Sequence, residues 1–170
     1  MNKQIKIVFA AALLVGLAAC AKKQEVKPAP APEPPVTETQ PADTGPAAFT
    51  PTDLDSNECL RQRVVYFDLD QSTIKPQFEA AIACHAKYLQ DRPDAQMTLD
   101  GNADERGSRE YNLGLGERRG NAVESALEAA GASASQITVV SHGEEQPVCR
   151  EHTESCWQKN RRVEIVYTVK

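Results

Sequence analysis

The chain has 170 residues, 41% of them hydrophobic and 25% charged, which is enough for one domain of ordinary size plus additional segments. Its 19 basic and 24 acidic side chains give a formal net charge of −5 at neutral pH. Nucleic-acid-binding proteins have strongly basic surfaces, so this balance argues against a nucleic-acid ligand, although it leaves neutral and zwitterionic ligands open.

Residues 1–19 have the pattern of a signal peptide. Residues 1–6 are short and basic, and residues 7–19 form an unbroken apolar or small-residue run that is too short to span a bilayer comfortably. Cys20 follows directly, and this resembles the bacterial lipobox, in which the cysteine carries acyl chains such as palmitate and becomes the mature N-terminus. The residue after the cysteine is Ala21 and not aspartate. In this the chain resembles lipoproteins that are sorted to the outer membrane. The alternative is a secreted protein with a chance cysteine.

Residues 20–52 are predicted to be a lipidated cysteine followed by a disordered tether. Eight of the eleven prolines lie in this segment, which has almost nothing to bury. At about 3.1 Å per residue in polyproline geometry, such a segment could reach nearly 100 Å. After removal of residues 1–19 the chain keeps 17 basic and 24 acidic side chains, a net charge of −7.

Four cysteines follow the tether, and an exported chain meets an oxidising compartment that favours disulfides. Three pairings are possible, and the short interval favours Cys149 with Cys156, which leaves Cys59 with Cys84. Loop closure gives about 2–3 kcal/mol for the short ring and about 3–4 kcal/mol for the longer one. Cys149, His152 and Cys156 also have metal-ligand spacing, but the sequence offers no fourth ligand, so we expect no metal.

Residues 53–170 are predicted to form the globular domain. The pattern predicts strands at 63–67, 96–100, 137–141 and 162–169. One helix has Pro76 in its first turn and stops before Pro93, and a second is capped by Ser108 and ends at Gly131. A short helical turn is expected before the last strand. This order indicates an α/β (α+β) two-layer sandwich.

Residues 101–120 contain a glycine-rich, charged loop that leads into the second helix. At 100° per residue, Arg119 lies near the middle of that helix's apolar face. The apolar members of this face are Leu115, Ala122, Val123, Ala126 and Ala130. A buried arginine needs a partner, because an unpaired buried charge costs several kcal/mol. Two readings remain: an internal salt bridge to the acidic loop residues Asp104 and Glu105, or a cleft in which Asp104 and Arg119 together hold a zwitterion.

Several motifs of residues 64–167 resemble the OmpA-like peptidoglycan-binding domain family. They are VYFDLDQSTI, HAKYL, NADERGSREYNLGLGERRGNAV, SHGEEQPV and WQKNRRVEIVY. The resemblance implies a βαβαβ(α)β domain with a mixed four-stranded sheet. It also implies the family ligand, the diaminopimelate residue of the peptidoglycan stem peptide, whose side chain ends in a carbon that bears both an amine and a carboxylate.

The resemblance assigns roles position by position. Asp104 of the N-x-D-x-x-G loop would take the ammonium group, and Arg119 would take the carboxylate bidentately. The remaining binding positions implied by the family are Asp70, Asn102, Asn112, Leu115 and Arg161. The chief departure is Ala103, where the family usually has threonine, which removes one hydroxyl but neither charge.

The resemblance further implies an outer-membrane lipoprotein whose domain faces the periplasm and anchors that membrane to peptidoglycan without a covalent bond. A TolB-like periplasmic protein would be a second partner, in a Tol–Pal-type system that acts in envelope integrity and cell division. No cofactor and no catalysis are expected. The adjacent pair Cys84-His85 does not make a nucleophile with its base, because neighbours on a helix point about 100° apart.

Overall fold

The computed structural model describes residues 48–170. The predicted signal peptide, the lipidation site Cys20 and nearly all of the tether lie outside the described residues. Among residues 48–170, no helix combines the length and the apolar character that crossing a bilayer requires.

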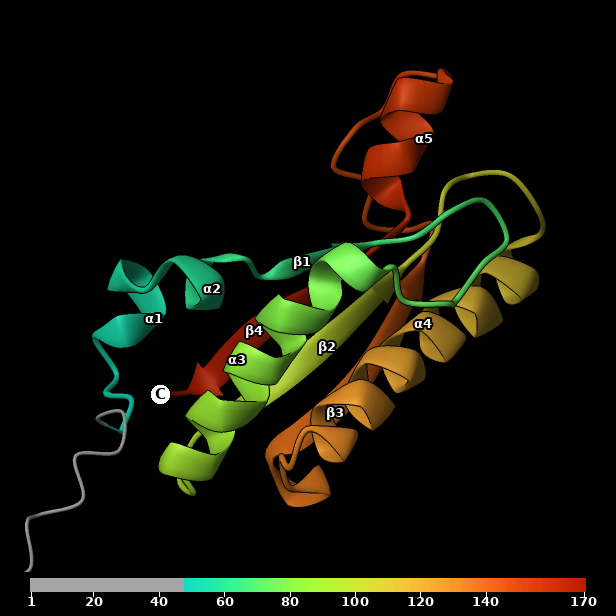
Figure 1. Ribbon diagram of the computed structural model, residues 1–170. Helices are drawn as coiled ribbons and strands as arrows, with labels where there is room; N and C mark the ends of the chain where they lie inside the picture. The colour runs from blue at the N-terminus through green and yellow to red at the C-terminus, as the bar shows by residue number, and fades with distance from the viewer. Residues whose placement is uncertain (1–47) are drawn as a thin grey trace, which may run out of the picture. The chain divides into compact units, whose positions relative to one another are not determined.

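A single four-stranded sheet forms one layer of the domain (Figure 1). The strands are β1 Val64–Tyr66, β2 Gln96–Asn102, β3 Ile137–Gly143 and β4 Arg162–Val169. Their order is β1-β4-β2-β3, with β4 antiparallel to both of its neighbours and β2 parallel to β3. The mixed four-stranded sheet expected from the family resemblance is confirmed.

Two long helices lie side by side on one face of this sheet (Figure 1). The 3-10 turn η1 Pro76–Phe78 leads into α3 Glu79–Asp91, and α4 is Arg109–Ala129. Ser108 caps α4 as predicted, since its side chain accepts a hydrogen bond from the backbone N–H of Tyr111 at 3.2 Å. Gly131 follows the end of α4 with φ +99°, a conformation that favours glycine.

The shorter helices are α1 Asp53–Ser56, α2 Glu58–Arg61, η2 Ala134–Gln136 and α5 Glu154–Asn160. The turn predicted before the last strand is α5. The sequence pattern did not predict α1 and α2, because four residues are too few to show a helical period.

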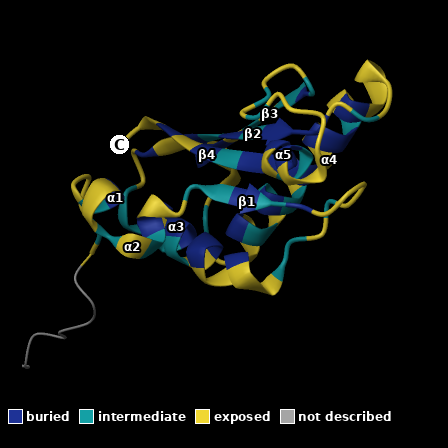
Figure 2. Cartoon of the chain, turned by 90° about the horizontal axis from the view of Figure 1, so that it is seen from above, coloured by how far each residue is buried: buried dark blue, intermediate teal, exposed yellow. Residues whose placement is uncertain are grey.

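The core lies between the sheet and the helices (Figure 2). Alternation along β4 points Val163, Ile165 and Tyr167 inward as predicted, and all three are buried. The apolar face predicted for α4 needs one correction. Ala130 is exposed, because α4 ends at Ala129 and Ala130 lies outside its regular turn, whereas Leu127, one turn after Val123, is buried on this face.

Both predicted disulfides are present. Cys59–Cys84 joins α2 to α3, and Cys149–Cys156 closes the loop that leads into α5. Because Cys149 and Cys156 bind each other, they do not act together as metal ligands. Upstream of α1, the backbone N–H of Phe49 donates to Asp91 Oδ2 at 3.0 Å, so the chain already contacts α3 at this residue.

His85 links α3 to β4 and to the residue that follows α2. Its ring nitrogens lie 2.9 Å from the hydroxyl of Tyr167 and 3.2 Å from the carbonyl of Gln62. Burial disfavours the charged ring and lowers the pKa of His85 to about 4.

We expect stability to fall as the pH is lowered from about 6.5 to about 4. In this window the unfolded state binds the His85 proton and the folded state does not, so the loss amounts to about 3 kcal/mol at most. Urea unfolding of wild type and His85→Gln at several pH values measures it. The variant should lose this component of the pH dependence, and parallel curves for the two proteins would contradict the assignment.

Two glycines let β2 and α4 approach closely. A Cβ at Gly101 would lie 2.1 Å from the carbonyl oxygen of Gly116, and a Cβ at Gly116 would lie 2.4 Å from Ser141 Oγ. This contact fixes the part of α4 that carries Arg119 against the carboxyl end of β2.

Gly116→Ala should therefore destabilise the domain by about 1–3 kcal/mol, since the neighbouring backbone has to move. Gly114→Ala is the matched control two residues earlier on α4. Its Cβ would meet only Arg118 Nη1 at 3.3 Å, so its better helix propensity should leave the protein as stable or more stable by up to about 1 kcal/mol. Equal free energies of unfolding for the two variants in urea would refute the close-packing account.

Candidate functional site

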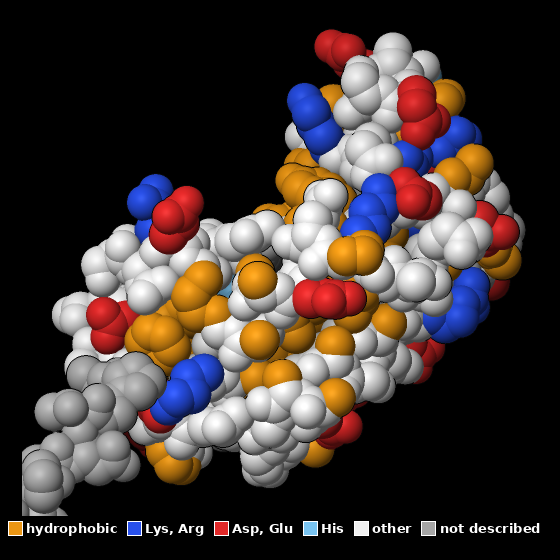
Figure 3. Space-filling view, viewed as in Figure 1, with side chains coloured by type: hydrophobic (Ala, Val, Ile, Leu, Met, Phe, Trp, Pro, Cys, Tyr) orange, Lys and Arg blue, Asp and Glu red, His pale blue; other side chains and the backbone are white. Residues whose placement is uncertain are grey.

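A pocket of about 230 Å³ opens where the loops after β1 and β2 meet α4. Five of the seven predicted binding residues line it: Asp70, Asp104, Leu115, Arg119 and Arg161. The other lining residues are Leu69 and Tyr111. Acidic and basic side chains are interspersed over α5 and the loops next to it (Figure 3).

Arg119 is completely buried, and backbone oxygens receive its hydrogen bonds. It donates to the carbonyls of Gln71 at 2.8 Å, Asn102 at 2.8 Å and Asp68 at 3.1 Å. These bonds use three of the five guanidinium N–H groups. Within residues 48–170 no carboxylate forms an ion pair with it. Burial lowers the pKa of Arg119 to about 10, which still leaves it charged at neutral pH.

Asp104 is also buried, but it has two arginine partners. Its Oδ2 lies 2.8 Å from Arg106 Nη2 and 3.1 Å from Arg161 Nη1, and its Oδ1 accepts the backbone N–H of Arg106 at 3.0 Å. Burial raises the pKa of Asp104, but the hydrogen bonds from Arg106 and Arg161 outweigh it, so the pKa lies below its usual value. The salt bridge between Asp104 and Arg119 that the sequence allowed is not formed. The two residues instead line the same pocket.

Asp70 is an exposed carboxylate at the pocket mouth. Its φ of +57° is in the left-handed region, which is uncommon for residues other than glycine. The hydroxyl of Tyr111 donates to Asp70 Oδ1 and so connects the β1 loop to the first turn of α4.

Sequence reasoning missed Tyr111 and Leu69 as pocket residues. Tyr111 lies one helical turn before Leu115, so helical spacing could have indicated it. Leu69 is 52% exposed between two aspartates, and a lone apolar loop residue gives no comparable signal.

Two predicted residues lie beside the pocket and do not line it. Asn102 contributes its backbone oxygen to Arg119, and its side-chain amide donates to the Asp100 carbonyl at 2.8 Å. Asn112 is buried and its side-chain amide donates to Glu144, so it does not line the pocket directly. Both residues fix the loops around the pocket.

Arg161 joins the pocket to α5. Its Nε donates to the Phe67 carbonyl at 3.2 Å, and its Nη2 lies 2.7 Å from Glu154 Oε1. With Arg119 it contributes the two positive charges of the lining, and Asp70 and Asp104 contribute the two negative charges. A small cavity with balanced but separated charges suits a ligand that carries an anion and a cation close together.

Comparisons with known proteins agree with this architecture. The model of the OmpA family matches residues 66–161. A peptidoglycan-associated lipoprotein of Pseudomonas putida is 47% identical over 100 residues, which cover 59% of this chain and 60% of the relative. The peptidoglycan-associated lipoprotein of Haemophilus influenzae is 33% identical over 171 aligned positions, covering 98% of this chain and all of the relative.

Solved structures show the same fold. The crystal structure of the peptidoglycan-associated lipoprotein from Burkholderia pseudomallei matches with a TM-score of 0.66 and 43% identity, over 68% of this chain and 98% of that one. The C-terminal domain of Helicobacter pylori MotB, at 22% identity and a TM-score of 0.58, shares the fold alone. Within the family, the motifs quoted from the sequence resemble the peptidoglycan-associated lipoproteins (Pal) most closely, and these matches confirm that prediction. The family model covers more than half of the sequence and one relative is similar over its full length, so this chain belongs to the OmpA family.

Proposed function

We propose that this protein is an outer-membrane lipoprotein that anchors its membrane to peptidoglycan through a non-covalent contact. The names of the relatives support association with peptidoglycan and a lipid anchor. The observation that carries the proposal is the buried guanidinium of Arg119, which lines the pocket. It uses three of its five N–H groups in hydrogen bonds and has no carboxylate partner within residues 48–170. A ligand carboxylate would supply that partner.

The ligand is the diaminopimelate residue of the stem peptide. Its terminal carboxylate binds Arg119, with the charge of Arg161 nearby, because a guanidinium that keeps one further N–H group on Nη1 and one on Nη2 suits a carboxylate. Its ammonium lies between Asp70 and Asp104 on the acidic side. Leu115 and Leu69 contact the methylene chain. In this arrangement both charges of the ligand lose water and gain a partner of opposite sign.

The protein acts by binding and not by catalysis. Cys84 is held in a disulfide, and both ring nitrogens of the neighbouring His85 have partners in the core, so this pair is not a nucleophile with its base. Among the charged pocket residues, Asp104 pairs with Arg161, Arg119 donates to backbone carbonyls, and Asp70 accepts the hydroxyl of Tyr111. Non-covalent binding is reversible, which suits a connection that has to move as the cell envelope grows.

The wider setting follows from the family. The domain faces the periplasm at the end of a lipidated tether, in a Tol–Pal-type system that maintains the envelope and acts in cell division. A TolB-like periplasmic protein is a further partner. These parts of the proposal rest on the likeness to peptidoglycan-associated lipoproteins and on the sequence of residues 1–52.

Peptidoglycan whose third stem residue is lysine tests the ligand directly. Lysine keeps the ammonium but lacks the terminal carboxylate, which would leave Arg119 desolvated without a partner. We expect binding to fall by more than about a hundredfold, since a site built around a polar group strongly rejects ligands that lack it. Co-sedimentation of the full chain with the two kinds of peptidoglycan measures this. Equal binding to both would refute the proposed ligand.

Asp70→Asn tests the acidic side with little change in shape. Removing this charge should weaken binding of a diaminopimelate muropeptide about tenfold, the equivalent of about 1.4 kcal/mol. Asp68→Asn is the matched control in the same loop, because the Asp68 carboxylate pairs with Lys75 at 2.6 Å and does not line the pocket. Similar losses in both variants, measured by calorimetric titration, would show that Asp70 has no specific contact with the ammonium.

A further inference from the structure

Asp104 is held by a cluster that extends beyond the pocket. Arg106 reaches it through Nε at 3.2 Å and Nη2 at 2.8 Å, in addition to its backbone N–H. The same guanidinium lies 4.2 Å from the ring centroid of Trp157, and its Nη1 lies 3.2 Å from Glu154 Oε2. Arg106 is therefore fixed on three sides, by a carboxylate, an aromatic face and a second carboxylate.

Arg106 supports Asp104 from outside the pocket. Asp104, Arg119 and Arg161 line the cavity, whereas Arg106 does not. The side chain of Arg106 is 31% exposed and that of Asp104 only 4%. The carboxylate thus faces the pocket on one side and the Arg106 guanidinium on another.

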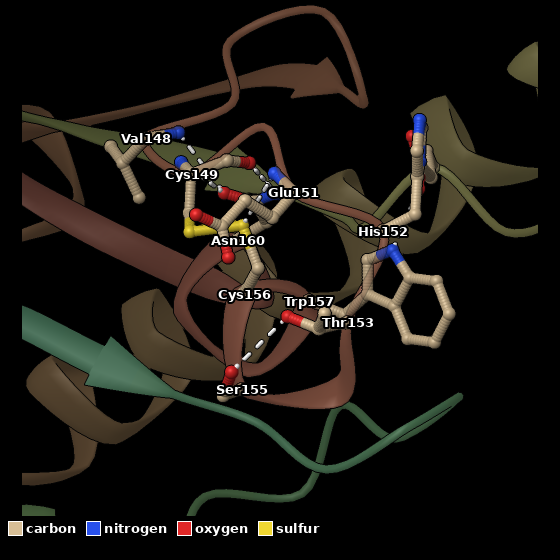
Figure 4. The surroundings of a disulfide bond; sticks show 10 residues. Val148, Cys149, Glu151, His152, Thr153, Ser155, Cys156, Trp157 and Asn160 are labelled. Atoms are coloured by element: carbon tan, nitrogen blue, oxygen red, sulfur yellow. Dashed lines mark hydrogen bonds and ion pairs between the residues drawn. A yellow bond between two sulfur atoms is a disulfide. The ribbon is translucent and has the colours of Figure 1, made fainter.

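The α5 surface that contacts Arg106 is cross-linked by a disulfide and by hydrogen bonds. Trp157 and Glu154 belong to α5, and the Cys149–Cys156 disulfide ties α5 to the loop before it (Figure 4). Asn160 closes that loop, because its Oδ1 accepts the backbone N–H of Cys149 at 3.1 Å. The indole N–H of Trp157 donates to Glu105 Oε1 at 2.7 Å, which joins α5 to the Asp104 loop.

We propose that Arg106 is a positioning residue, through which α5 holds the Asp104 carboxylate charged and aimed at the ammonium of the ligand. This inference deepens the proposed function and rests on it. Trp157 and Glu154 position Arg106, which in turn fixes Asp104. The ligand does not displace Arg106 when it binds.

The charged groups around Asp104 determine how its protonation changes when the Arg106 side chain is removed. Arg106 and Arg161 donate to it, Arg119 lies across the pocket, and Glu105, Glu154 and Asp70 are the nearby acids. Without the Arg106 side chain, burial raises the pKa of Asp104, and only Arg161 and the backbone N–H of residue 106 remain hydrogen-bonded to oppose that rise. The carboxylate then takes up a proton at a higher pH than in wild type, and a protonated Asp104 does not hold an ammonium group.

The experiment uses the full chain in detergent and a soluble muropeptide that contains diaminopimelate. Arg106→Met should bind about tenfold more weakly at pH 7, and its affinity should begin to fall at a higher pH than that of wild type as the solution is acidified. Arg109→Met is the matched control, because Arg109 is a nearby arginine that is 72% exposed and pairs with Glu145, away from Asp104. Its affinity and pH profile should equal those of wild type.

Trp157 supplies a second, independent readout. It is the only tryptophan in the chain, so its fluorescence reports on the Arg106 contact. Muropeptide binding to wild type should leave the emission maximum unchanged, since Arg106 stays in place. Trp157→Phe should keep most of the affinity by preserving an aromatic face, whereas Trp157→Leu should lose it to the same degree as Arg106→Met.

The outcomes separate the two proposals. If wild type fails to bind the muropeptide, the proposed function fails. If wild type binds and Arg106→Met binds equally well with an unshifted pH profile, only the positioning role fails. Tighter binding by Arg106→Met, together with a shift of Trp157 emission on titration of wild type, would make Arg106 a competitor of the ligand and would also overturn the inference.

Discussion

The buried guanidinium of Arg119 is the constraint on which the site depends. By donating to three backbone carbonyls it holds the loop after β1 and the end of β2 against α4. Carbonyl dipoles offset part of the cost of burying the charge, but they do not neutralise it. The side chain therefore does two things at once. It fixes the walls of the pocket, and it leaves a positive charge there that the carboxylate of the proposed ligand can neutralise.

The topology explains why the site forms at this end of the sheet. Because β4 is antiparallel to both β1 and β2, these two strands run in the same direction, and β3 runs parallel to β2. The segments after β1 and β2 emerge at the same end of the sheet, on either side of β4, and supply Asp70 and Asp104, and Arg161 precedes β4 at that end. Ligands of α/β sheets commonly bind at the carboxyl ends of strands for this reason. The glycine contact between β2 and α4 then sets how closely Arg119 approaches that edge.

Much of this arrangement could be predicted from the sequence, and the rest depended on contacts that periodicity does not encode. Strand alternation, the Ser108 cap and cysteine spacing identified the individual strands, the start of α4 and both disulfides, and the family resemblance implied the mixed sheet. The helical projection placed Arg119 in the interior. It did not reveal that carbonyls would receive its hydrogen bonds, or that Asp104 would pair with Arg106 and Arg161, because loop conformation decides those partners.

The Cys59–Cys84 disulfide has a consequence for how the domain carries mechanical load. The described chain begins beside α1, at the opposite end of the sheet from the pocket (Figure 1). If this end of the chain is pulled while the pocket is held, the force acts along the strands. It is transmitted through α2 before it reaches β1. At Cys59 the covalent bond passes part of the force into α3, so tension is shared between a three-residue edge strand and a thirteen-residue helix packed in the core. The shortest strand pairing of the sheet, β1 with β4, therefore does not bear the whole load.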